Sequence, residues 1–178
     1  KSIFNLVYKG KNLGQVQLSA PGEHNILNSL GAAAIGLEMG LDSKIIIEGL
    51  NSYDGVRRRF EVKGKVNNII VVDDYAHHPT EVTATLSTAK KSWNRRTIGV
   101  FQPHLFSRTK EFYKEFAAAM MLSDVAIITD IYPAREKPII GISGKLIYEE
   151  MKSLGHKNIH YIPDLDNLNI VVENNVKK

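Results

Sequence analysis

The first part of the chain alternates apolar and polar residues in two short segments and then changes to a helical spacing. Residues 3–8 and 13–18 predict two strands joined by a Gly-Lys-Asn turn, which together form a hairpin. From Glu23 onward, apolar residues recur at helical spacing until Gly40 supplies a stop. This stripe predicts a helix with a buried face and consists of Ile26, Leu27, Leu30, Ala33, Ala34 and Leu37. A second helix is expected from about Ser43 to Asn51.

Beyond the turn at Tyr53-Asp54-Gly55, strand and helix candidates alternate. The predicted strands are residues 60–66, 69–72, 97–101, 125–129 and 159–162, and the predicted helices begin at Pro79 and cover 109–122 and 145–154. Residues 69–72 are apolar enough to be buried on both faces. This alternation predicts the α/β class, with a Rossmann-like, doubly wound and mostly parallel sheet. We therefore place a domain boundary near Gly55, dividing residues 1–55 from residues 56–178.

Composition narrows the class of protein without naming a function. The 178 residues are 43% hydrophobic and 24% charged, as in ordinary globular proteins. No run approaches the ~20 apolar residues that span a bilayer, and the first residues lack the features of a signal peptide. The absence of cysteine excludes disulfides and thiolate metal sites, which is compatible with a cytosolic protein. The net charge of +4 has one cluster, Arg57-Arg58-Arg59, which favours phosphate handling over nucleic-acid wrapping.

Polar, titratable residues follow three successive predicted strands, in segments 73–79, 102–108 and 130–136. A single Asp or His at a strand end is commonly a turn or capping residue. Three such junctions in a row favour a site, because ligands of open α/β sheets bind at the carboxyl ends of the strands. Asp73 and Asp74 point to opposite faces of an extended backbone, so one of them faces the cleft, and the sequence leaves open which.

The histidines of these junctions also raise the possibility of a metal site. Imidazoles at His77, His78 and His104, with a carboxylate nearby, are potential ligands. Their spacing matches no ligand pattern, such as two histidines one helical turn apart, so we assign no metal ligands. A metal-dependent phosphohydrolase built on these histidines with Asp73 and Asp74 is kept as a remote alternative.

Two further groups lie before and at the predicted boundary. Asn25 and Asn28 share one helix face, and each amide offers a donor and an acceptor, as the reading of an adenine edge requires. The alternative is an ordinary helix cap. The cluster Arg57–Arg59 could deliver a guanidinium onto a phosphate when two domains close, or it could be a solvated basic turn.

Taken together, these segments resemble the Mur ligases, the amide-forming enzymes of peptidoglycan precursor synthesis, and most closely the members that add the first alanine. Residues 21–28 resemble a helix of the central ATPase domain, and residues 55–61 resemble the entry into the C-terminal domain. Residues 73–81 resemble the nucleotide-contacting loop of that domain. Residues 101–104 and 130–136 resemble segments that separate the alanine-adding members from their relatives.

The resemblance implies a reaction and its participants. ATP, with Mg2+, would phosphorylate the lactyl carboxylate of UDP-N-acetylmuramate, and L-alanine would attack the acyl phosphate. It implies a cytoplasmic enzyme with no nucleic-acid or membrane partner. Adenine would be contacted by His24, Asn25 and Asn28, an ATP phosphate by Arg59 or Arg58, and the ribose by Asp74. The muramyl carboxylate and the incoming alanine would be faced by His77, His78, His104 and Arg108.

The chain also departs from the family pattern. Leu105 stands where the family usually has an Arg, so Arg108 carries more of the inferred role. The Gly-Lys-Thr/Ser phosphate loop, the acidic magnesium ligands of the central domain and the N-terminal domain are not found in the chain. We therefore expect a C-terminal piece that is inactive by itself, and residues 170–178 lead toward a further element.

Three alternative functions remain open beside this reading. One is a murein peptide ligase, or a Mur ligase that adds a later residue. The second is the phosphohydrolase described above. The third, a basic nucleic-acid-binding module, is the least favoured, because no aromatic stacking platform accompanies the Arg cluster.

Overall fold

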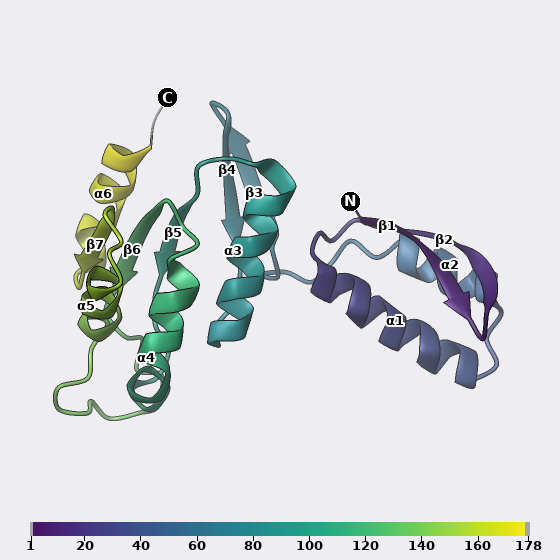
Figure 1. The fold of residues 1–178 in the computed structure, drawn as a ribbon, viewed down its shortest axis with the longest axis horizontal. Coiled ribbons are helices and arrows are strands. Elements are labelled where there is room, and N and C mark those ends of the chain that lie inside the picture. The colour runs from purple at the N-terminus through teal and green to yellow at the C-terminus, as the bar shows by residue number, and fades with distance from the viewer. Residues whose placement is uncertain (1, 177–178) are drawn as a thin grey trace. The chain divides into compact units, whose positions relative to one another are not determined.

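The hairpin and the two helices expected at the start of the chain are confirmed in the computed structural model, which describes residues 2–176 (Figure 1). Strands β1 (Ser2–Tyr8) and β2 (Lys11–Leu18) pair antiparallel, and helices α1 (Glu23–Glu38) and α2 (Ser43–Asn51) follow. The turn between the strands contains Gly10, which has a positive φ, a conformation that glycine adopts readily. The buried side chains that form this core are Leu6, Val16, Leu18, Ala33 and Ile46.

The predicted buried face of α1 is only partly correct. Ala33 is buried and Ile26 and Leu37 pack against the core, whereas Leu27 is 62% exposed and Leu30 is 39% exposed. Ala34 is exposed as well. The apolar stripe is broader than the surface offered by the hairpin and α2, so the residues on its margin remain in solvent.

A second hairpin follows, made of β3 (Glu61–Val66) and β4 (Ile69–Asp73), paired antiparallel. Asn67 and Asn68 join them, both at positive φ, as a two-residue hairpin turn requires. The expectation that β4 is buried on both faces is wrong, because Val71 is 52% exposed. Within the described residues β4 pairs with β3 alone, and a two-stranded sheet cannot enclose both of its faces.

The remainder of the chain confirms the α/β class with a parallel sheet. Strands β5 (Ile98–Phe101), β6 (Val125–Thr129) and β7 (Ile159–Ile162) form a parallel sheet in the order β5-β6-β7. Every residue of β6 is buried, as expected for the central strand of a covered parallel sheet. The helices of this part of the chain are α3 (Pro79–Trp93), α4 (Phe106–Met120), α5 (Lys145–Ser153) and α6 (Leu168–Asn175), and a short 3-10 turn covers Leu165–Asn167.

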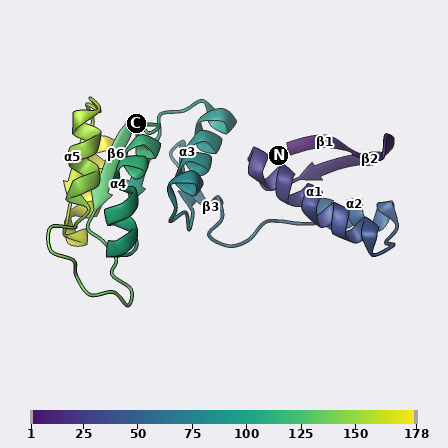
Figure 2. The same ribbon diagram turned by 60° about the horizontal axis from the view of Figure 1, so that its bottom comes forward.

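Helices α4 and α5 pack together on one side of the sheet, as Figures 1 and 2 show. Phe116, Ile128 and Met151 are completely buried in the core that they share with α3. Pro79 takes the first position of α3, as predicted. Helix α4 begins at Phe106 rather than at Thr109, and α6 forms where the sequence indicated only the approach to a further element.

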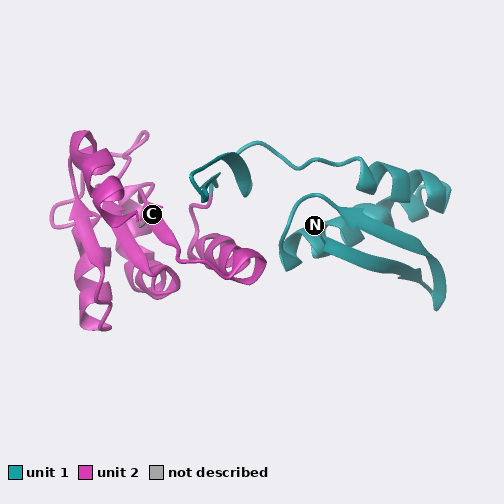
Figure 3. Cartoon of the chain, turned by 90° about the horizontal axis from the view of Figure 1, so that it is seen from above, with its two compact units in different colours: residues 1–75 teal, residues 76–178 magenta. Residues whose placement is uncertain are grey.

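The chain divides after Tyr75 into two compact units, residues 1–75 and residues 76–178 (Figure 3). The β3–β4 hairpin is thereby grouped with the first unit, although the change in sequence pattern lies near Gly55. The boundary near Gly55 therefore stays a prediction. Among the helices described here, none is both long and apolar enough to cross a membrane.

Candidate functional site

Three of the predicted site residues meet in the second unit, beyond the carboxyl ends of its parallel strands. The Arg108 Nη1 group donates to the His77 carbonyl oxygen at 3.3 Å and lies 3.5 Å from His104 Nδ1. The rings of His77 and His104 have their centroids 6.3 Å apart. The sequence placed these residues on two separate junctions, and the fold brings them to one place.

His104 is held by the neighbouring junction. It forms a parallel bridge with Tyr132, whose N–H donates to the Pro103 carbonyl at 2.8 Å. The Leu105 N–H donates in return to the Tyr132 carbonyl at 3.0 Å. The Tyr132 ring stacks on the His104 ring, with centroids 5.7 Å apart and planes inclined by 23°. The segment after β6, residues 130–136, therefore fixes the imidazole of His104 in the segment after β5.

His78 has a structural role in addition to any chemical one. It is the N-cap of α3, where its Nδ1 accepts the Thr80 N–H at 3.4 Å, and its ring meets Phe112 edge-on at 5.3 Å. The Glu81 Oε2 atom accepts the N–H groups of His77 at 3.0 Å and of His78 at 3.1 Å. The His78 ring is thus packed against Phe112 of α4 while its Nδ1 atom caps α3.

Sequence reasoning assigned no role to Glu81, Tyr132 or Glu136, although all three lie in the segments that it singled out. The spacing of Glu81, three residues after the cap, is the signal of a capping box and could have been used. The contacts of Tyr132 and Glu136 join distant segments, and no local spacing reveals them.

The electrostatic environment keeps His104 neutral. Burial lowers the pKa of His104 below its ordinary value of 6.5, and the positive charge of Arg108 and the proximity of His77 lower it further. A cationic imidazole beside a guanidinium would be unfavourable, whereas a neutral one can still donate and accept a hydrogen bond. At neutral pH the Arg108 cation therefore lies next to the uncharged imidazole of His104.

The second predicted group lies in the first unit, where the two aspartates take different partners. The Asp73 carboxylate lies 3.6 Å from Arg58 Nε, and the Arg58 guanidinium lies over the Tyr75 ring at 4.8 Å. The Asp74 Oδ2 atom instead accepts the Phe60 N–H at 2.9 Å. Arg58 is thus engaged by Asp73 and Tyr75.

The third predicted group occupies the first turns of α1. His24 and Asn28 are exposed there, and Asn25 is half-buried. The Asn25 Nδ2 group donates to the Pro21 carbonyl at 2.7 Å, which ties the helix to the segment before it. Gly22, and not an asparagine, is the N-cap of α1.

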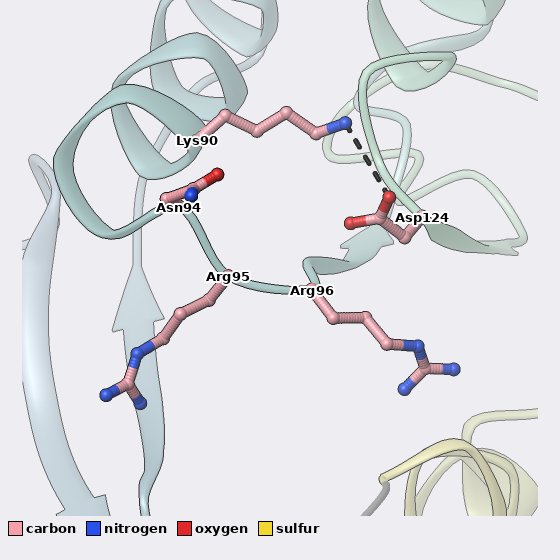
Figure 4. Close-up of a pocket in the computed structure, with 5 residues that line it drawn as sticks. All are labelled: Lys90, Asn94, Arg95, Arg96 and Asp124. Atoms are coloured by element: carbon pink, nitrogen blue, oxygen red, sulfur yellow. Dashed lines mark ion pairs between the residues drawn. The ribbon is translucent and has the colours of Figure 1, made fainter.

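A polar hollow of about 520 Å3 lies at the opposite, amino-terminal ends of β5 and β6 (Figure 4). Lys90 there pairs with Asp124 at 3.7 Å, and Arg96 donates to the Asn175 carbonyl of α6. Figure 4 shows the Arg95 and Arg96 side chains diverging. These contacts tie neighbouring elements together, and the residues predicted for the site do not line this hollow. In residues 2–176, no three His, Asp or Glu side chains are grouped so that they could hold a metal ion.

Comparison with known proteins identifies the family to which this chain is similar. The family model described as Mur ligase, glutamate ligase domain, matches residues 58–177. The UDP-N-acetylmuramate–L-alanine ligase of Salinibacter ruber is 45% identical over 166 residues, which cover 93% of this chain and 35% of that protein. The enzyme of the same name from Carboxydothermus hydrogenoformans is 47% identical over 175 residues, covering 98% of this chain and 38% of that protein.

Solved structures show the same likeness. The crystal structure of the UDP-N-acetylmuramate-alanine ligase of Thermotoga maritima has a TM-score of 0.73 at 34% identity, covering 95% of this chain and 35% of that one. A murein peptide ligase of Psychrobacter arcticus has a TM-score of 0.66 at 27% identity, covering 92% of this chain and 34% of that one. This chain thus spans about a third of the length of these relatives. With its parallel sheet, its grouped junction residues and a family match from residue 58 to residue 177, the chain belongs to the Mur ligases.

Proposed function

We propose that this chain is the C-terminal part of an ATP-dependent ligase that joins L-alanine to UDP-N-acetylmuramate in peptidoglycan precursor synthesis. The reaction would proceed through an acyl phosphate on the lactyl carboxylate. The observation that carries the proposal is the grouping of His77, His104 and Arg108 beyond the parallel strands. The names of the relatives at 44–49% identity supply the substrates.

Arg108 is suited to hold the carboxylate of the incoming amino acid. Its Nη1 group makes the two contacts described above, so other N–H groups of the guanidinium can form a bidentate pair with a carboxylate. The neighbouring His104 adds no second positive charge, because its pKa is lowered. An ammonium must lose a proton before it can attack an acyl phosphate, and a neutral imidazole is a suitable acceptor.

The nucleotide contacts are proposed from residues of the first unit. His24, Asn25 and Asn28 would read adenine; Asn25 retains its carbonyl oxygen as an acceptor, since its amide group donates to Pro21. An ATP phosphate would be contacted by Arg59, with Arg58 as the alternative, as the resemblance to the family implies.

The remaining participants follow from the same proposal. Asp74, anchored by the Phe60 N–H, would hold the ribose. Mg2+ would offset the charge of the phosphates, and we assign its ligands to the remainder of the protein. The N-terminal and central domains of the relatives would complete the site, so the chain alone is expected to be inactive.

The test measures ADP release by the full-length protein with ATP, Mg2+ and UDP-N-acetylmuramate. We expect release to depend on L-alanine and to fall about 100-fold or more in kcat/KM when Arg108 is changed to Ala. Dependence on a murein peptide in place of alanine would identify a murein peptide ligase instead. Turnover by the 178-residue chain alone would contradict the proposed division of the active site.

A further inference from the structure

The first turn of α4, which carries Arg108, lacks a cap from its own N-cap residue. That residue is Leu105, which has no side chain to accept a backbone N–H and has φ at +74°, a region that non-glycine residues rarely adopt. The first N–H groups of a helix have no partners within the helix and need acceptors from elsewhere. An acceptor must therefore come from another segment.

Glu136 supplies this acceptor from 29 residues further along the chain. Its Oε2 atom accepts the Ser107 N–H at 2.9 Å, and its Oε1 atom accepts the Ser107 hydroxyl at 2.5 Å. These two hydrogen bonds are here named the Ser107–Glu136 clasp. They lower the pKa of Glu136, the hydroxyl contributing most, and the charge of Arg108 acts in the same direction. The carboxylate is thus ionised at neutral pH, and its charge suits a helix N-terminus.

The clasp joins α4 to the long loop between β6 and α5, residues 130–144. Before Glu136 in this loop, Tyr132 is fixed to Pro103 and Leu105 by backbone hydrogen bonds and to His104 by ring stacking. A turn in which the Glu136 N–H donates to the Pro133 carbonyl at 2.9 Å then brings the carboxylate back over Ser107. His104 and Arg108 are therefore held by the same loop, one through Tyr132 and the other through Glu136.

We propose that Glu136 is a positioning residue, which acts through Ser107 to hold Arg108 in place for the carboxylate of the incoming amino acid. This inference rests on the proposed function. In this view the loop after β6 fixes both the Arg108 guanidinium and the His104 imidazole. A displaced guanidinium binds a carboxylate less tightly, because the bidentate pair depends on the position of its N–H groups.

The test compares Glu136→Gln, Glu136→Ala and Ser107→Ala with wild type in the full-length protein. Gln retains one acceptor oxygen but loses the charge, so its effect should lie between those of wild type and Ala. We expect Glu136→Ala to raise KM for L-alanine about tenfold or more while kcat changes by less than about threefold, because ground-state positioning is lost. Glu115→Gln, on the exposed part of the same helix, is the matched control and should leave KM unchanged.

Hydrogen exchange in the 178-residue chain provides a second measurement that does not depend on activity. The Ser107 amide should exchange about tenfold faster or more in Glu136→Ala, as loss of its acceptor predicts. An unchanged KM in an active, folded Glu136→Gln and Glu136→Ala pair would overturn the inference, as would unchanged protection of Ser107. A wild-type protein without alanine-dependent turnover would overturn the proposed function instead, and the exchange result would show whether the clasp exists.

Discussion

His104 combines a place in the candidate site with a pKa below its ordinary value. The unfolded chain, in which the ring titrates normally near 6.5, binds a proton more readily than the folded chain does. The contribution of this residue to stability is therefore present above pH 6.5 and is lost as the pH falls toward the lowered pKa. Folding thus extends to lower pH the range in which this ring is neutral.

This linkage gives the first prediction. The free energy of unfolding should decrease as the pH falls from about 7.5 to about 5.5, and part of that slope should disappear in His104→Gln, whose side chain stays neutral. Chemical denaturation at a series of pH values measures the free energy of unfolding of each variant and hence the slope. The exposed His24 supplies the control, because His24→Gln should leave the slope as it is. Equal slopes in wild type and His104→Gln would refute the prediction.

A second prediction concerns Gly144, the N-cap of α5. A Cβ atom there would lie 2.0 Å from the Thr129 carbonyl oxygen. Neither atom can move without its backbone, because the oxygen belongs to the backbone and the Cβ is attached to it. Gly144→Ala should destabilise the chain by about 3 kcal/mol or more, since the helix start must move away from β6. Gly49→Ala in α2, where nothing lies within 4 Å, should be neutral or stabilising. Thermal denaturation of the two variants compares them directly.

The junction residues show how far a sequence can define a site. The positions of His104 and Arg108 followed from the order of the strands, because parallel strands bring their carboxyl ends to one edge. His77 follows β4, which pairs antiparallel with β3, so its place beside them depends instead on the packing of α3 against α4. The turning of His78 toward Phe112 did not follow, since it depends on the capping geometry of α3. The engagement of Arg58 with Asp73 did not follow either, because it depends on the register of β3 against β4 and on the course of the chain before β3.

Helix α3 supplies a prediction for an element. Glu81 accepts the N–H groups of two successive histidines at the start of this helix. Glu81→Ala should cost about 1 kcal/mol of stability, the usual value of a lost cap. Calorimetry should show a lower melting temperature for this variant and an unchanged one for Glu115→Ala, whose side chain is exposed on α4. A Glu81→Ala protein as stable as wild type would show that the capping box contributes nothing.

The residue ranges of the helices and strands were predicted better than the burial of their faces. The strands of the parallel sheet and helices α1, α2, α3 and α5 lie close to their expected ranges, because periodicity is a local property. The outer face of α1 and the exposed side of β4 were assigned wrongly, because burial depends on which layer covers an element. Helix α4 begins early for a related reason, since the residue that caps it, Glu136, is distant in sequence.

The two compact units have separate cores, and this yields a prediction for the whole molecule. Phe116 is completely buried in the second unit, and Val16 is completely buried in the first. Phe116→Ala, expected to cost about 3–5 kcal/mol, should lower one thermal transition and leave the other unchanged. Val16→Ala should do the reverse. A single transition that both substitutions shift together would show that the units unfold as one.

The loop after β6 also offers a position for a reporter of ligand binding. Ile140 is completely exposed and lies between Glu136, held by Ser107, and Gly144, whose N–H donates to Asp130 at 3.1 Å. The chain has no cysteine of its own, so Ile140→Cys creates one unique thiol for a fluorescent dye. Because Glu136 is held at the first turn of α4, which carries Arg108, the emission of such a dye would report the binding of a ligand at this part of the site in real time.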